Sequence, residues 1–145
     1  MSDTSSQQLV VFSLGSEEYA LPIGAVHEII RYTEPRSVES DVSWVRGVIG
    51  LRGKIIPIFD LAARMGLAPS EPGKIVIVEA GSGQAGVMVD EVEEVLTVSA
   101  SQLEDVPTAS AGSIEAIAKI EDRLVILLDA VGLFAPEGRP EPATA

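Results

Sequence analysis

The sequence contains no cysteine, one histidine and one tryptophan among its 145 residues. Without thiols the chain cannot form disulfide bonds, a cysteine nucleophile or a zinc site built on thiolates. No apolar run approaches the roughly 20 residues of a membrane-spanning helix, so we expect no direct membrane insertion. Residues 1–8 lack the basic region and apolar core of a signal peptide, which favours a cytoplasmic protein.

Basic side chains are also scarce: 10 Lys and Arg stand against 22 Asp and Glu, for a net charge of −12. This balance argues against nucleic acid as a partner, because a polyphosphate needs a basic surface. The charge is uneven, since residues 31–54 carry a net charge of +2 and residues 75–122 carry −9. The acidic part either keeps the protein soluble or forms a face matched in charge to a partner.

The clearest local pattern lies in residues 44–61. Two runs rich in β-branched residues, 45–51 and 54–59, flank Arg52-Gly53, and glycine at the second loop position supplies the positive φ of a tight hairpin turn. Asp60 is then expected to cap a short helix from Leu61 to Met65 that ends at Gly66. The segment therefore predicts a β-hairpin followed by one helical turn.

Other segments show two kinds of spacing. Residues 9–14 and 19–23 alternate between apolar and polar, which predicts a second hairpin. Helical spacing of apolar residues follows in two places and predicts two short helices lining a groove. The residues concerned are Val26, Ile29 and Ile30, and then Val92, Val95 and Leu96.

The second half of the chain repeats the first. A shift of 66 places residues 9–30 on 75–96, and a shift of 69 places residues 48–65, which include most of the hairpin and the helical turn after it, on residues 117–134. Chance similarity of apolar strands is the alternative to a duplicated unit. Because a few short strands must protect their edges, we predict a mainly β fold of two small five-stranded β-barrel lobes with short helices. The expected lobes span about 8–67 and 74–135 within one domain of residues 8–135, with tails at 1–7 and 136–145.

Catalytic chemistry finds little support in the sequence. His27 beside Glu28 is a candidate general base or phosphate acceptor, but an exposed helix residue is the simpler interpretation. No nucleophile elbow, catalytic cysteine or paired-histidine metal spacing accompanies it. Asp60 and Asp129 occupy equivalent places in the two halves, so helix capping explains them better than acid–base work. We therefore expect no catalytic residue, no metal site and no cofactor; an enzyme or phosphorelay protein using His27 is the rival hypothesis.

Glu28 and Arg52 lie in segments that are expected to approach the groove between the lobes. They are either two solvated charges of little energetic weight or an ion pair that shapes the groove. Their counterparts Glu94 and Glu121 cannot pair, so such a pair is expected in the first lobe alone. Trp44, just before the hairpin, is equally compatible with a core position and with an interface.

Together these segments resemble the CheW family of coupling proteins in bacterial chemotaxis, over about residues 8–134. The resemblance implies two five-stranded barrels, no catalytic activity, and an adaptor that links chemoreceptors (methyl-accepting chemotaxis proteins) to the histidine kinase CheA at membrane receptor arrays. Coupling in another pathway, such as gliding or pilus motility, is the alternative. The segments that carry the resemblance are residues 44–61, 19–23, 28–30, 89–92 and 124–129.

The resemblance also implies three contact surfaces. The cytoplasmic tip of the receptor, a helical hairpin, would contact Val26, Glu28, Arg52 and Ile75. The regulatory domain of CheA would contact Val38, Val42 and Trp44. A further contact within the array ring would involve Asp105, Val106 and Pro107.

Overall fold

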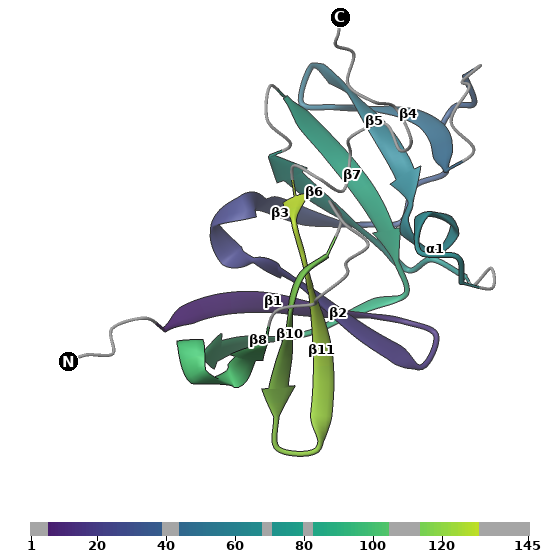
Figure 1. Ribbon diagram of the computed structural model, residues 1–145. Coiled ribbons are helices and arrows are strands. Elements are labelled where there is room, and N and C mark those ends of the chain that lie inside the picture. Colours follow the sequence, from purple (N-terminus) through teal and green to yellow (C-terminus); the bar gives the residue numbers. More distant parts are fainter. Residues whose placement is uncertain (1–5, 39–43, 68–70, 80–82, 105–113, 131–145) are drawn as a thin grey trace, which may run out of the picture.

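The computed structural model describes residues 6–38, 44–67, 71–79, 83–104 and 114–130, which form two β-sheets (Figure 1). The expected tails lie outside these ranges, except that the first strand already begins at Gln7. No helix in the described ranges is long and apolar enough to cross a membrane.

A six-stranded sheet occupies the lower half of Figure 1 and a five-stranded sheet the upper half. In spatial order, the six strands are β8 (Glu91–Val98), β1 (Gln7–Leu14), β2 (Glu17–Pro22), β11 (Arg123–Leu128), β10 (Ile114–Ile120) and β9 (Leu103–Glu104). The five strands are β3 (Val26–Arg31), β6 (Lys74–Glu79), β7 (Gln84–Val89), β5 (Lys54–Asp60) and β4 (Val45–Leu51). The helical elements are α1 (Leu61–Arg64) and the 3-10 turns η1 (Ile23–Ala25) and η2 (Ala100–Gln102).

The repeat seen in the sequence governs the order of the strands. Strands β1 to β5 correspond under the repeat to β6, β7, β8, β10 and β11. When each strand of the five-stranded order β3-β6-β7-β5-β4 is exchanged for its counterpart, the order becomes β8-β1-β2-β11-β10, which is that of the first five strands of the other sheet. The mainly β class with two similar β-lobes is confirmed. The closed barrels are not: among the described residues, β3 and β4 are end strands of one sheet, and β8 and β9 of the other.

The two halves of the chain exchange their first hairpins. The β1–β2 hairpin lies in the six-stranded sheet with β8 to β11, and β2 pairs in parallel with β11. The β6–β7 hairpin lies in the five-stranded sheet, where β7 pairs in parallel with β5. The sheets therefore differ from the expected lobes, since strands of residues 8–67 and of residues 74–135 occur in both. Exchange places the two most apolar hairpins in the middle of the sheets, where both faces are buried.

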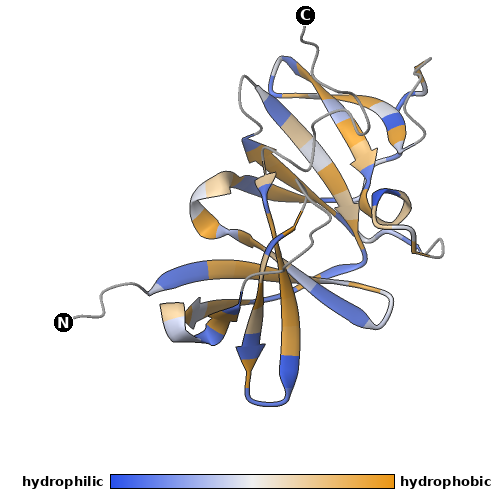
Figure 2. Cartoon of the chain, viewed as in Figure 1, coloured by the Kyte–Doolittle hydropathy of each residue, from blue (hydrophilic) through white to orange (hydrophobic). Residues whose placement is uncertain are grey.

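Three hydrophobic clusters hold the molecule together, and Figure 2 shows apolar residues along the middle strands with hydrophilic hairpin tips. Each sheet surrounds an interior of its own, built on residues such as Leu9 and Leu127 in one and Ile75 and Ile58 in the other. The exchanged hairpins meet at a central seam. Its main residues are Phe12, Leu14, Tyr19, Leu21, Val76, Val78, Val87 and Val89.

The five-stranded interior is packed without spare space at Gly86. A Cβ atom there would lie 2.7 Å from Ile58 Cδ1 and 2.8 Å from Ile75 Cγ2. These distances are too short for carbon atoms, so glycine lets β7 approach its neighbours.

The two expected short helices are wrong, because both segments are strands. In β3, side chains alternate between half-buried and exposed, so Ile30 packs toward the interior while Ile29 is 40% exposed. Helical spacing and strand alternation share several positions in so short a segment, and β-branched residues favour the strand. Strand β8 carries a bulge opposite Val11 and Phe12. The extra residue lengthens the spacing between apolar residues beyond the two-residue period of a regular strand, so the segment resembles a helix in sequence.

The hairpin and the helical turn after it are confirmed. Arg52 and Gly53 both have positive φ values, 52° and 81°. The Asp60 carboxylate accepts a hydrogen bond from the Ala63 N–H at 3.1 Å and caps α1. Gly66, with φ of 76°, ends the helix in the left-handed conformation.

Candidate functional site

The tip of the β4–β5 hairpin holds an exposed ion pair with edge strand β3. Arg52 donates from Nε to Glu28 Oε1 at 3.1 Å and from Nη2 to Glu28 Oε2 at 2.8 Å. The hydrogen bonds from Arg52 lower the pKa of Glu28 below its ordinary value. This confirms that the two residues form a pair rather than two separate charges. Because the Arg52 side chain remains 70% exposed, the pair is open to a partner.

Arg52 uses only part of its hydrogen-bonding capacity on Glu28. A guanidinium group carries five N–H donors in a planar fork, and the pair engages Nε and one hydrogen of Nη2. The remaining donors are available to a carboxylate or a carbonyl oxygen. The bidentate contact also orients the guanidinium plane before any partner arrives.

Several exposed apolar residues lie close to Glu28 or Arg52 in the sequence. Ile29 is 40% exposed on β3, Ile23 is 42% exposed on η1, and Ile55 is 71% exposed three residues after Arg52. Large apolar side chains left in water are a common property of protein-binding surfaces. Ile55 therefore adds exposed apolar surface to the hairpin that carries Arg52, whereas Ile29 faces the opposite side of β3 from Glu28.

The two further residues expected at the receptor site differ in burial. Ile75 is fully buried in the five-stranded interior, between Ile30 on β3 and Met88 on β7 in the strand register. A partner cannot reach this side chain in the folded protein, which corrects the expectation of a direct contact. Val26 is half-buried against the central seam.

His27 lies on strand β3 and not on a helix. Its Nδ1 is 3.4 Å from Glu79 Oε2, and Gln84 Nε2 donates to the same carboxylate oxygen at 3.1 Å. Both partners of the His27–Glu79 pair are about half exposed. In the part of the chain that the structure describes, no group of three or more His, Asp or Glu side chains is arranged to hold a metal ion.

Two of the three residues expected at the kinase contact, Val38 and Trp44, belong to the described ranges. Val38 is 45% exposed, and Val42 lies outside the described residues. Trp44 is half-buried, with the Arg64 guanidinium 4.8 Å from its ring centroid, and does not belong to any buried cluster. Its partial exposure and its absence from the buried clusters of described residues favour the interface interpretation of Trp44, and Arg64 covers one face of its ring. Asp105, Val106 and Pro107 all lie outside the described residues.

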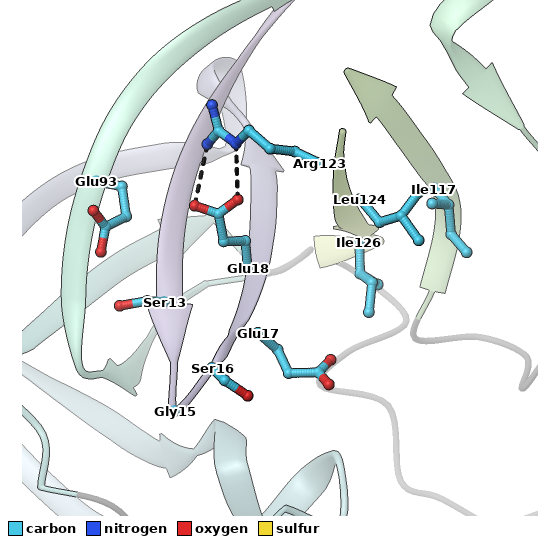
Figure 3. A pocket seen from close by; sticks show the side chains of 10 residues that line it. All are labelled: Ser13, Gly15, Ser16, Glu17, Glu18, Glu93, Ile117, Arg123, Leu124 and Ile126. Atoms are coloured by element: carbon cyan, nitrogen blue, oxygen red, sulfur yellow. Dashed lines mark hydrogen bonds and ion pairs between the residues drawn. The ribbon is translucent and has the colours of Figure 1, made fainter. Parts of the chain in front are cut away.

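Arg123 is the residue that sequence reasoning missed. It donates from Nε and Nη2 to Glu18 at 3.0 and 3.1 Å, and its Nη1 lies 2.9 Å from Glu94 Oε2 (Figure 3 draws the Glu18 contact). Glu94 therefore pairs with Arg123 and not with Glu121, the counterpart of Arg52, and an arginine–glutamate pair is not confined to the first half of the chain. The sequence pointed to Arg123 only through its place after the Glu121-Asp122 tip, at the position of Lys54 in the repeat. Its contacts could not be predicted from this place, because they depend on the pairing of β11 with β2, which is far away in the sequence.

Comparison with known proteins agrees with the geometry. The family model described as CheW-like domain matches residues 8–137. A chemotaxis protein CheW of Bacillus subtilis is 32% identical over 92% of this chain and 90% of its own length. The crystal structure of the scaffolding protein TtCheW from Thermoanaerobacter tengcongensis superposes with a TM-score of 0.84 at 34% identity, covering 92% of this chain and 95% of the other. Protein PilI of Pseudomonas aeruginosa is 36% identical over 56% of this chain and 47% of its own length.

Proposed function

The chain belongs to the CheW-like family, and from this membership we propose that it is a non-catalytic adaptor coupling chemoreceptors to the histidine kinase CheA in bacterial chemotaxis. The adaptor works in the cytoplasm and is recruited to membrane receptor arrays. The observation that carries the proposal is the exposed Glu28–Arg52 pair, held at the tip of a rigid hairpin.

The receptor tip, a helical hairpin, docks against the surface around this pair. Glu28 holds the Arg52 guanidinium in one orientation, so little side-chain entropy is lost when its remaining donors meet the receptor. The exposed Ile55, three residues after Arg52 on the same hairpin, supplies apolar contact for the same partner. Ile75 supports strand β6 from inside and contributes shape, while the partly buried Val26 on β3 contacts the receptor through its exposed part.

Two further surfaces complete the adaptor. The regulatory domain of CheA contacts Val38, Val42 and Trp44, with Arg64 stacked on the Trp44 ring. The array ring contact involves Asp105, Val106 and Pro107. Separate surfaces for receptor and kinase let one small protein bind both partners at once.

The test replaces Arg52 by aspartate and compares receptor-dependent activation of CheA in reconstituted membranes. Arg52→Asp places a carboxylate next to Glu28, so receptor coupling should be abolished while the unfolding midpoint stays that of a folded protein. The matched control is Lys54→Asp, which makes the same charge change two residues away on the same hairpin and should retain coupling. Normal receptor pull-down and kinase activation by Arg52→Asp would remove the assignment of this site.

The similarity to Protein PilI supports an alternative within the same fold. In that alternative the chain couples receptors to the kinase of another chemosensory pathway, such as gliding or pilus motility. Co-purification from the native cell, followed by identification of the kinase and receptors that accompany the chain, distinguishes the two pathways.

A further inference from the structure

A second candidate surface lies on the six-stranded sheet, away from the Glu28–Arg52 pair. It is an open groove of about 610 Å³ next to the tip of the β1–β2 hairpin (Figure 3). Its apolar wall comes from Ile117 on β10 and Ile126 on β11, which lie opposite each other in the strand register, and from Leu124 on the same face of β11. Leu124 is 61% exposed. We call this surface the acidic groove; the remaining residues that line it are Ser13, Gly15, Ser16, Glu17, Glu18, Glu93 and Arg123.

The rim of the acidic groove carries unneutralised carboxylates. Glu17 on β2 and Glu93 at the bulge of β8 have no hydrogen-bond or ion-pair partner among the described residues. The hairpin tip next to Leu124 adds Glu121 and Asp122. The strands of the six-stranded sheet and this tip carry nine acidic and two basic side chains, net −7, whereas the five-stranded sheet and its 52–53 tip carry three acidic and five basic ones, net +2.

The walls of the acidic groove are held in place by the chain itself. Asp90 accepts a hydrogen bond from the Gly15 N–H at 2.7 Å, and its own N–H donates to the Ser13 carbonyl at 3.0 Å. On the other wall, Arg123 holds Glu18 through two hydrogen bonds. A groove that is ordered before binding loses little conformational entropy when it is occupied.

We propose that the acidic groove docks a segment of another protein in which a large apolar side chain is flanked by lysine or arginine. The apolar side chain covers Leu124 and Ile126, and the basic side chains meet Glu17 and Glu93. Covering exposed apolar surface supplies affinity, and the negative rim selects against acidic segments. This inference concerns a different sheet from the receptor site and stands independently of the proposed function.

The repeat provides an internal control for this proposal. Ile55 is the counterpart of Leu124 and is 71% exposed, so the same position presents an apolar side chain on both sheets. The charge at the hairpin tip is reversed, because Arg52 stands where the other sheet has Glu121, while Lys54 and Arg123 beside the two apolar residues are both basic. A basic segment should therefore bind near Leu124 and not near Ile55, although both side chains are apolar and exposed.

The experiment titrates isotope-labelled full chain with a short synthetic peptide that carries leucine residues between lysines, and follows backbone amide shifts by NMR. Shifts should concentrate at Gly15, Ser16 and residues 117–126, and affinity should fall as salt rises from about 0.05 to about 0.5 M. The same peptide with glutamate in place of lysine should not bind.

Variants then locate the binding energy. Leu124→Ser should weaken binding of the lysine peptide by about tenfold. The double variant Glu17→Lys and Glu93→Lys should weaken it by about tenfold or more. Ile55→Ser should leave its affinity unchanged. Equal binding of the glutamate peptide, equal loss in Ile55→Ser, or shifts centred on Arg52 would overturn the proposal. So would self-association of the free chain that Leu124→Ser abolishes, because the groove would then be an interface between copies of this chain.

Discussion

The two sheets share one plan in their interiors and differ at their rims. Leu9 in the six-stranded sheet and Ile75 in the five-stranded sheet are equivalent under the repeat, and both are fully buried. At the rims, an arginine of each sheet forms an ion pair with glutamate, but the two arginines differ in exposure and in the number of glutamates that they contact. Arg52 is 70% exposed and contacts one glutamate, whereas Arg123 is 35% exposed and contacts two. Duplication has preserved packing and left the ends of the strands free to diverge.

A displacement of two residues explains the different roles of the arginines. Arg52 lies in the turn itself, where a positive φ directs the chain out of the sheet. Arg123 occupies the position of Lys54 at the start of a strand, on the same face as Val125 and Leu127, which pack in the interior. The same residue type is therefore exposed at a hairpin tip on one sheet and joins three strands on the other.

The largest expected effect tests whether the interiors are equivalent. Ile75→Ala and Leu9→Ala should each lower the free energy of unfolding by about 2–5 kcal/mol, because each leaves a cavity in a packed interior. Urea denaturation measures both, and Ile55→Ala, at an exposed position, serves as the control with little effect. An Ile75→Ala variant of unchanged stability that loses receptor binding would restore Ile75 as a contact residue.

A smaller effect separates the two arginines. Arg123→Met should cost roughly 1 kcal/mol of stability, because Glu18 and Glu94 are left with like charges and no shared cation. Arg52→Met should lower the urea midpoint by less than Arg123→Met does, because its pair is more exposed, and should reduce receptor coupling as well. The comparison fails if the two variants lose equal stability. Adding Glu18→Gln to Arg123→Met should recover part of the loss, since it removes one of the two repelling charges.

The hairpin tips differ by a still smaller amount. Glu121 has a φ of 56° and no ion-pair partner among the described residues, so its backbone strain is not offset by a contact like that of Arg52. Glu121→Gly should raise the unfolding free energy by about 0.5 kcal/mol, the relief of strain exceeding the entropy cost of glycine. Thermal unfolding measures the change, and a lowered midpoint would show that the Glu121 side chain contributes to the tip.

The smallest effect is a shift in titration. Hydrogen bonds from Arg52 lower the pKa of Glu28 in the folded state. The contribution of the pair to stability is therefore present above the ordinary carboxyl pKa and is lost as pH falls through the lowered folded value. NMR titration of the Glu28 carboxyl group should show a depressed pKa that rises toward its ordinary value in Arg52→Met. An identical titration in both proteins would mean that the pair does not persist in solution.

Much of the fold could be predicted from local patterns. The turn at Arg52-Gly53, the cap at Asp60 and the stop at Gly66 follow from requirements of two or three neighbouring residues, and each is confirmed. The repeat also predicted equivalent strands, because insertions between the halves are few. These features depend on chain geometry that the sequence specifies nearby.

The errors arose where distant segments decide the structure. The short segments at Val26 and Val92 fit a helix by spacing and became edge strands because β6 and β1 offer them hydrogen bonds. Ile75 was assigned to the receptor site by the resemblance alone, and its side chain is buried because the four central residues of β6 are apolar and buried on both faces. The contacts of Arg123 require a parallel pairing between β2 and β11, which local patterns do not specify.

The exchanged hairpins impose an order on the making of this protein. Glu18 leaves the ribosome 105 residues before Arg123, its partner in the finished sheet. At bacterial rates of elongation, the β1–β2 hairpin waits about 5 to 20 seconds for the strand that lies beside it. Neither half of the nascent chain holds a complete sheet, so a ribosome that stalls near residue 70 carries an unfinished β-structure with exposed edges. The six-stranded sheet can consequently be completed only after β11 has left the ribosome.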